Sequence, residues 1–127
     1  MEELIRIHVN VISAEEVKCG DEKFCLILFD GYADGDLFSG KILPGGVDCQ
    51  HFSKNGGTLS ARYILDGTDF TGKHCRLFIE NNADAGSDVT HPSVKTDSEA
   101  LKWLQDEPIS GRINFENNLI TIEIGRF

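Results

Sequence analysis

The fold is decided by residues 40–82, which read GKILPGGVDCQHFSKNGGTLSARYILDGTDFTGKHCRLFIENN. Apolar and polar residues alternate in three segments of this stretch, 47–53, 58–65 and 74–81. A period of two indicates β-strands with one face buried. Asn55-Gly56-Gly57 stands between the first two segments and is a strong hairpin signal. The stretch therefore predicts neighbouring antiparallel strands.

The same pattern extends outward in both directions. It predicts further strands over 3–12, 23–29, 37–43, 109–116 and 119–126, with a polar loop over 13–22 and irregular chain over 82–95. Asn117-Asn118 suits a tight turn with left-handed backbone angles. Residues 98–105 predict a short amphipathic α-helix, because Thr96 and Glu99 have the spacing of a capping box.

Eight short strands joined mostly by turns favour an all-β antiparallel domain. The 127 residues fit one domain, residues 1–127. We expect an up-and-down or nearly closed β-barrel with one peripheral α-helix, since closure removes the exposed strand edges. A two-sheet β-sandwich is the alternative.

The segment KFCLILF, residues 23–29, is apolar on both faces. A strand of this kind needs cover on both sides. The single helix could supply that cover, or a partner subunit could, which would make the protein a homo-oligomer through residues 23–29.

Polar side chains on the three central strands form the candidate site. A barrel of about eight strands can hold one small ligand on a mostly apolar wall with a few polar groups. A two-residue Asn55-Gly56 loop would set Asp48 opposite Tyr63, whereas a three-residue loop would set Gln50 opposite Arg62. The sequence leaves both registers open, and also an outward face with ordinary cross-strand pairs. The candidate ligand-binding residues are Asp48, Gln50, Arg62, Tyr63 and Glu80.

The net charge and the spacing of cysteine and histidine residues limit the kinds of partner and cofactor that we expect. The net charge of −9 disfavours nucleic acid and anionic membranes as partners, because both need a basic patch. The N-terminal sequence lacks signal-peptide features, and no apolar run is long enough to span a membrane, so we expect a cytoplasmic protein. We expect the four cysteines to be reduced and mostly buried. No metal-ligand set and no nucleotide fingerprint stands out, so we expect neither a metal nor a cofactor.

Three segments of the central stretch resemble motifs of the small β-barrel proteins in domain-of-unknown-function family 3237. They are LPGGVDCQ, LSARYILDGTD and CRLFIENN. The shared marks are Pro44-Gly45-Gly46 followed by Asp48, then Ala61-Arg62-Tyr63, then Glu80-Asn81. Family members usually carry an aromatic residue where this chain has Cys49. The resemblance implies a single-domain β-barrel and no settled activity.

Three functions follow from these observations as hypotheses. The first is a binding module for a small organic molecule, anionic or carbonyl-bearing, held by Arg62 and its polar neighbours. The second is a cofactor-free enzyme of isomerase, cyclase or lyase type. In that case Asp48 or Glu80 would be the general base, and Arg62 or Tyr63 would stabilise an oxyanion. The third is an oligomeric structural or interaction protein.

Overall fold

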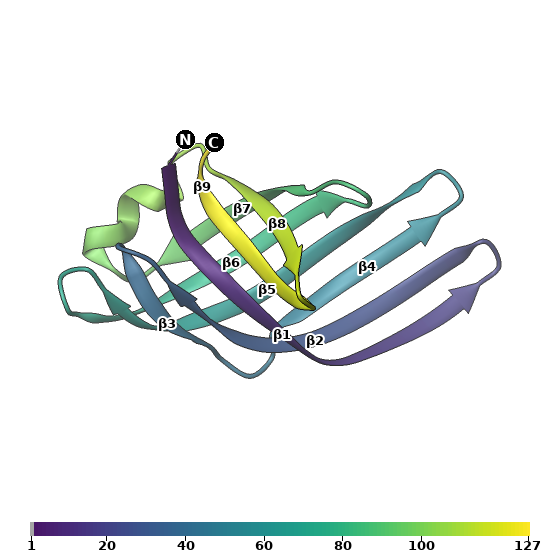
Figure 1. The fold of residues 1–127 in the computed structure, drawn as a ribbon, viewed down its shortest axis with the longest axis horizontal. Helices are drawn as coiled ribbons and strands as arrows, with labels where there is room; N and C mark the ends of the chain where they lie inside the picture. The colour runs from purple at the N-terminus through teal and green to yellow at the C-terminus, as the bar shows by residue number, and fades with distance from the viewer. Residues whose placement is uncertain (1) are drawn as a thin grey trace.

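The computed structural model describes residues 2–127, which form one nine-stranded antiparallel sheet and one short helix (Figure 1). In chain order the elements are β1 (Glu2–Cys19), β2 (Glu22–Asp34), β3 (Phe38–Ile42), β4 (Val47–Ser53), β5 (Gly56–Asp69), β6 (His74–Asp84), β7 (Val89–Thr96), the 3₁₀ helix η1 (Glu99–Gln105), β8 (Ser110–Glu116) and β9 (Leu119–Arg126). Strand β1 pairs with both β9 and β2, so the sheet closes into a near-ring. The predicted all-β barrel is confirmed, with one strand more than expected.

Two strands share one place in the ring. β3 and β4 both lie between β2 and β5: β4 pairs with residues 23–28 of β2, and β3 pairs with its residues 32 and 33. The break between them is the Pro44-Gly45-Gly46 turn. Gly45 has a φ of +111°, and Gly46 lies so close to Phe29 that a Cβ there would be 2.8 Å from the Phe29 carbonyl oxygen. The turn thus interrupts the strand without opening the barrel.

The β4–β5 hairpin has a register that differs from both predicted registers. Ser53 pairs with Gly56, so the loop is Lys54-Asn55, and Asp48 faces Ala61. The Ser53 hydroxyl donates to the Gly56 carbonyl oxygen at 3.1 Å and accepts from the Asn55 N–H at 3.4 Å. Gly56 takes the positive φ, +124°, just after the loop rather than within it. Compared with the predicted two-residue loop, the pairing is displaced by two residues, so the same side chains face inward, whereas the three-residue loop would have placed Arg62 on the face of Asp48.

Three predicted segments and one predicted helix cap differ from the structure. Residues 89–96 form β7 instead of irregular chain, and β1 runs to Cys19 through the predicted polar loop. The helix over Glu99–Gln105 is a 3₁₀ helix rather than an α-helix, and its N-cap is Ser98, not Thr96. Its backbone bonds run three residues apart, from the Leu101 N–H to the Ser98 carbonyl oxygen at 3.3 Å. Seven residues are few for an α-helix, and short helical pieces commonly tighten in this way.

The core lies inside the barrel and consists of alternate residues of the strands. Ile5, Leu65, Leu77 and Ile124 are fully buried, and Leu101 of η1 joins them. Figure 1 shows η1 at the end of the barrel opposite the tips of the long β1–β2 and β4–β5 hairpins. Helix η1 therefore contributes to the core at one end and does not cover β2.

The outer face of β2 stays uncovered. Phe24, Leu26 and Leu28 point outward and are 44 %, 52 % and 44 % exposed, while Cys25, Ile27 and Phe29 point inward. Of the two sources of cover that the sequence left open for residues 23–29, helix η1 does not supply it, and a partner subunit stays a prediction.

No helix in residues 2–127 is long and apolar enough to cross a membrane.

Candidate functional site

The inner face of β4, β5 and β6 carries a row of polar and small side chains. Asp48 pairs with Ala61, and Ala61 pairs with Asn81, so these three lie side by side on the same face. Neighbouring strands are about 4.8 Å apart, which places the Asp48 and Asn81 backbones roughly 10 Å apart. The small side chain of Ala61 therefore lies between two polar side chains on this face. Tyr63 follows Ala61 on the same face two residues along β5.

Four buried polar atoms along this inner face have no hydrogen-bond partner within residues 2–127. They are Asp48 Oδ1, Tyr63 OH, Asn81 Oδ1 and Thr90 Oγ1. Tyr63, Asn81 and Thr90 are each at least 95 % buried. An unpartnered buried polar group costs about 1–3 kcal/mol, so a cluster of four needs an explanation. Groups of this kind are what a bound molecule with complementary polar atoms would satisfy.

Gln50 orients the Asp48 carboxylate. Its Nε2 donates to Asp48 Oδ2 at 2.8 Å, from two residues further along the inner face of β4. One carboxylate oxygen is therefore held by the protein, and Oδ1 remains available as an acceptor.

Tyr63 is held as a neutral phenol. Burial raises its pKa above the ordinary value, since the phenolate would lose its hydration. The Phe29 ring meets the Tyr63 ring edge-on, with centroids 5.5 Å apart. At neutral pH the hydroxyl thus keeps its proton and can donate it in a hydrogen bond.

Thr90 completes the cluster from β7, next to Gly111 of β8. A Cβ on Gly111 would lie 2.2 Å from Thr90 Oγ1 and 3.7 Å from Asn81 Nδ2. Only glycine therefore leaves room for the Thr90 hydroxyl in its present position. Sequence reasoning missed Thr90 because residues 82–95 were expected to be irregular, and it did not include Asn81 among the site residues although Asn81 belongs to a quoted family mark.

Arg62 and Glu80 do not join the inner cluster. Both point outward, and Arg62 Nε donates to Glu80 Oε2 at 2.7 Å in an exposed ion pair. Such a pair contributes little to stability. Of the five candidate residues, the structure brings together Asp48, Gln50 and Tyr63 on the inner face and places Arg62 and Glu80 on the outer one.

Thiols and metal-ligating groups lie apart from the cluster. Cys75 is buried, whereas Cys19 and Cys49 are exposed, so the expectation of mostly buried thiols is wrong. Among residues 2–127, no group of three or more His, Cys, Asp or Glu side chains is placed to hold a metal ion. The chemistry of the inner face is that of a carboxylate, two amides and two hydroxyl groups.

Comparison with known proteins supports the fold. No family model and no curated protein matches the chain, so membership of domain-of-unknown-function family 3237 stays a prediction. A protein of unknown function from Clostridium acetobutylicum ATCC 824 is similar in structure, with a TM-score of 0.81, 25 % identity, and coverage of 97 % of this chain and 93 % of that chain.

Two further solved structures share the architecture. A β-barrel-like protein from Acinetobacter baumannii AYE has a TM-score of 0.78 and 17 % identity, covering 97 % of this chain and 92 % of that chain. An enzyme from Penicillium herquei has a TM-score of 0.72 and 19 % identity, covering 98 % and 92 %. The chain is thus a small β-barrel-like protein.

Proposed function

We propose that this protein binds a small organic molecule inside the barrel, against Asp48, Gln50, Tyr63, Asn81 and Thr90. The observation that carries the proposal is the set of four buried, unpartnered polar atoms on one inner face. Natural proteins rarely leave such atoms unsatisfied without a functional reason. The surrounding wall is apolar, as small-molecule sites usually are.

The chemistry of the site suggests the kind of ligand. Tyr63 and Thr90 can donate to a carbonyl oxygen, and Asp48 Oδ1 and Asn81 Oδ1 can accept from a hydroxyl or amine. Arg62 points outward, so the inner cluster offers no cation to an anionic group. A neutral carbonyl- or hydroxyl-bearing molecule therefore fits better than an anionic one.

A thermal-shift screen with a library of neutral carbonyl and hydroxyl compounds tests the proposal, followed by titration calorimetry of each hit. We expect Tyr63→Phe and Asp48→Asn each to weaken the binding of a genuine hit at least tenfold, about 1.4 kcal/mol. Arg62→Gln is the matched control on the outer face of the same strand, and it should leave the affinity unchanged. Hits that bind equally well to all three variants would count against the inner site.

A second candidate is a cofactor-free acid–base enzyme at the same cluster. The observation that favours it is the free Oδ1 of Asp48 on the same face as the neutral Tyr63 phenol. Asp48 would accept a proton from the substrate, and the Tyr63 hydroxyl would donate to the oxygen that becomes negative. The structural neighbour from Penicillium herquei is described as an enzyme, which is consistent with this chemistry on the same fold.

Chromatography and NMR spectroscopy of each screening hit after incubation with the protein separate the two candidates, because an isomerised or cyclised product has the same mass as its substrate. If the protein is an enzyme, the wild type should form a product and the Asp48→Asn variant should form none. The control variant Arg62→Gln should form the product as the wild type does. Compounds that the wild type binds tightly but does not convert would support the binding function and contradict the enzymatic one.

A further inference from the structure

We infer that the molecule held by the inner cluster enters at the end of the barrel formed by the β1–β2 and β4–β5 hairpins, and that Leu59 selects the molecules that pass. The route runs over a strip of inner wall, which we name the entry wall. Its members are Cys25, Gln50, Phe52, Gly57 and Leu59. The inference rests on the proposed function, because it assigns a path to the same site.

The opposite end of the barrel is closed by helix η1. Leu101 and Leu104 of η1 are 0 % and 1 % exposed, so their side chains fill that end. Ser98, which precedes η1, donates to Asp69 Oδ2 at the end of β5 at 2.7 Å. Figure 1 shows the β1–β2 and β4–β5 hairpins at the other end, where they extend beyond β8 and β9. A path to the inner cluster is therefore expected at the hairpin end.

The inner-face residues of β5 become more exposed toward the hairpin end. Tyr63 and Leu65 are buried, whereas Ala61 and Leu59 are half-buried. The same holds on β4, where the inner-face residues are all half-buried. On the neighbouring strand β6, Asn81 is buried. Solvent thus reaches the polar cluster along β4 and β5.

The inner side chains near β6 become smaller in the same direction. Leu77 and Ile79 are large and fully buried, whereas Ala83 and Ala85 lie toward the β6–β7 turn. Between the two pairs lies Asn81, whose buried Oδ1 has no hydrogen-bond partner within residues 2–127. Protein interiors are close-packed, so small side chains beside an open end leave space for a bound molecule.

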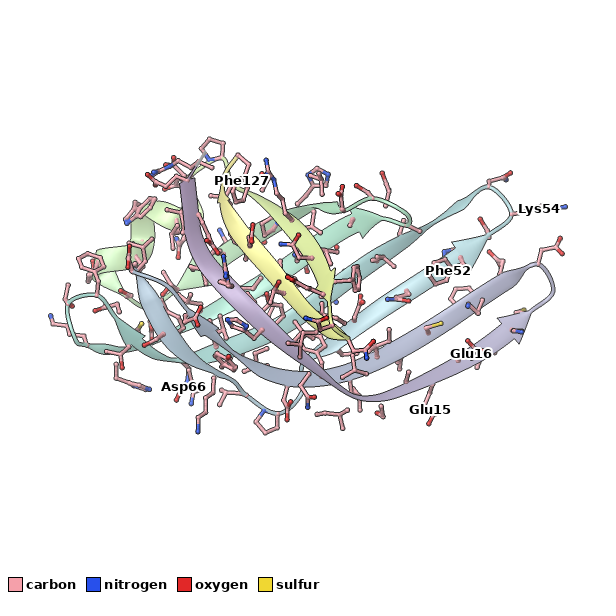
Figure 2. All side chains as sticks on the ribbon, viewed as in Figure 1. Glu15, Glu16, Phe52, Lys54, Asp66 and Phe127 are labelled. Carbon is pink, nitrogen blue, oxygen red and sulfur yellow. The ribbon has the colours of Figure 1, made fainter. Side chains whose placement is uncertain are left out.

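Phe52 lies across the entry wall. It pairs with Gly57, and a Cβ on Gly57 would be 2.9 Å from Phe52 Cδ1 and 3.2 Å from Ala85 Cβ. Because Gly57 has no side chain, the Phe52 ring can lie over β5, and Lys23 Nζ is 5.0 Å from the ring centroid. Figure 2 shows Phe52 on the part of β4 that extends toward the hairpin tip. The ring therefore gives the route an apolar surface at its outer end.

Leu59 lies between the hairpin end and the polar cluster. It follows Gly57 and precedes Ala61 on the inner face of β5, and it pairs with Gln50 on β4 and Ala83 on β6. Both of its inner-face neighbours on β5 are small, so Leu59 is the side chain that narrows this part of the wall. A molecule that reaches Ala61 from the hairpin end passes Leu59, which makes Leu59 a determinant of specificity.

Association kinetics of a screening hit test the role of Leu59. The probe is the neutral carbonyl or hydroxyl compound whose affinity Asp48→Asn lowers most, and surface plasmon resonance measures its association rate. We expect Leu59→Trp to slow association at least tenfold. Thr58→Trp, at an exposed position on the outer face of the same strand, should leave the rate unchanged. Thermal denaturation shows whether both variants are folded. An unchanged rate with folded Leu59→Trp, or equal slowing by both variants, overturns the role of Leu59.

Alkylation of Cys25 by iodoacetamide is a second test, which uses the wild-type chain. Cys25 pairs with Gln50 on the entry wall, whereas Cys49 is exposed on the outer face. The thiolate displaces iodide and forms a thioether, which peptide mass spectrometry assigns to each cysteine. The same probe at about ten times its dissociation constant leaves roughly one eleventh of the protein free. Labelling of Cys25 should therefore slow roughly tenfold, and labelling of Cys49 should not change.

The outcomes separate this inference from the proposed function. A probe whose affinity depends on Asp48 but which leaves the labelling rate of Cys25 unchanged shows that the path is wrong and that the binding function stands. If Asp48→Asn leaves the affinity of every hit unchanged, the proposed function is wrong and the path falls with it.

Discussion

Asp48 and Asn81 flank Ala61 on the inner wall of the barrel, and each keeps a buried oxygen without a hydrogen-bond partner within residues 2–127. This relationship arises from the register of the β4–β5 hairpin. A shift of one residue would turn Asp48 outward and place Cys49 opposite Ala61. The central proposal, a ligand held between these two side chains, depends on this spacing.

Ala61→Leu should abolish ligand binding while the barrel still folds. The larger side chain would occupy the space between Asp48 and Asn81, and overpacking at a partly buried position costs about 1–3 kcal/mol. Calorimetric titration of a screening hit measures the loss, and thermal denaturation confirms folding. Ser60→Leu, on the outer face of the same strand, is the control and should bind normally.

Tyr63→Phe should stabilise the free protein even as it weakens binding. The Tyr63 hydroxyl is buried without a partner, so its removal relieves a desolvation cost of about 1 kcal/mol or more. Urea denaturation of the free protein measures the change in the free energy of unfolding. A clear decrease in stability would mean that the hydroxyl has a partner in the folded protein.

Gly111→Ala should destabilise the barrel, and Thr90→Ala should rescue it. The new Cβ would lie 2.2 Å from Thr90 Oγ1, whereas the next nearest atom, Thr90 Cβ, is 3.6 Å away. Threonine is restricted at χ1, so we expect the single variant to lose about 1–3 kcal/mol. Denaturation of the two single variants and the double variant measures the coupling. Simple additivity of the two single effects would contradict the steric account.

Asp69 should make the stability of the fold depend on pH in the acid range. Hydrogen bonds from Thr71 and Ser98 lower the pKa of this carboxyl to about 2, and the Ser98 hydroxyl donates to it at 2.7 Å. Because the folded pKa lies below the unfolded value of about 3.9, the stabilisation is fully present above that value. It is lost as the pH falls from about 4 through about 2.

Thermal denaturation of the wild type and Asp69→Asn across this range measures the effect. The variant should melt at a lower temperature than the wild type at pH 7, and the gap should close as the pH approaches 2. Asp84→Asn, at an exposed position on β6, is the control and should follow the wild type. A gap that stays constant with pH would assign the effect of Asp69→Asn to packing instead of charge.

The sequence predicted the strands wherever apolar alternation was strong, as in residues 3–12 and 119–126, and it placed the Asn117-Asn118 turn correctly, with φ of 51° and 65°. The strand prediction failed for segments whose outward-facing residues are polar or whose inward-facing residues are only weakly apolar. Strand β7 reads VTHPSVKT, and its inward residues include Thr90 and Pro92. Pro92 is tolerated because β8 pairs with β7 only at Val89 and Thr90, so the missing N–H is not needed there.

The sequence could not settle which of the five candidate residues share the inner face. Asp48, Gln50 and Tyr63 do share the inner face, but Arg62 and Glu80 point outward because neighbouring positions alternate along a strand. The hairpin rule favoured a loop containing Asn55-Gly56, whereas Ser53 caps a loop one residue earlier. The loop therefore shifts by one residue and the pairing by two, so that Asp48 faces Ala61 instead of Tyr63 while Asp48 and Tyr63 stay on the same face.

The most direct test of the central claim is a crystal structure of the protein with its strongest thermal-shift hit. The account predicts electron density for the compound on the inner face, with polar atoms within hydrogen-bonding distance of Asp48 Oδ1 and Asn81 Oδ1. A compound bound instead on the outer face, beside Arg62 and Glu80, with the inner cluster unchanged, would contradict the account.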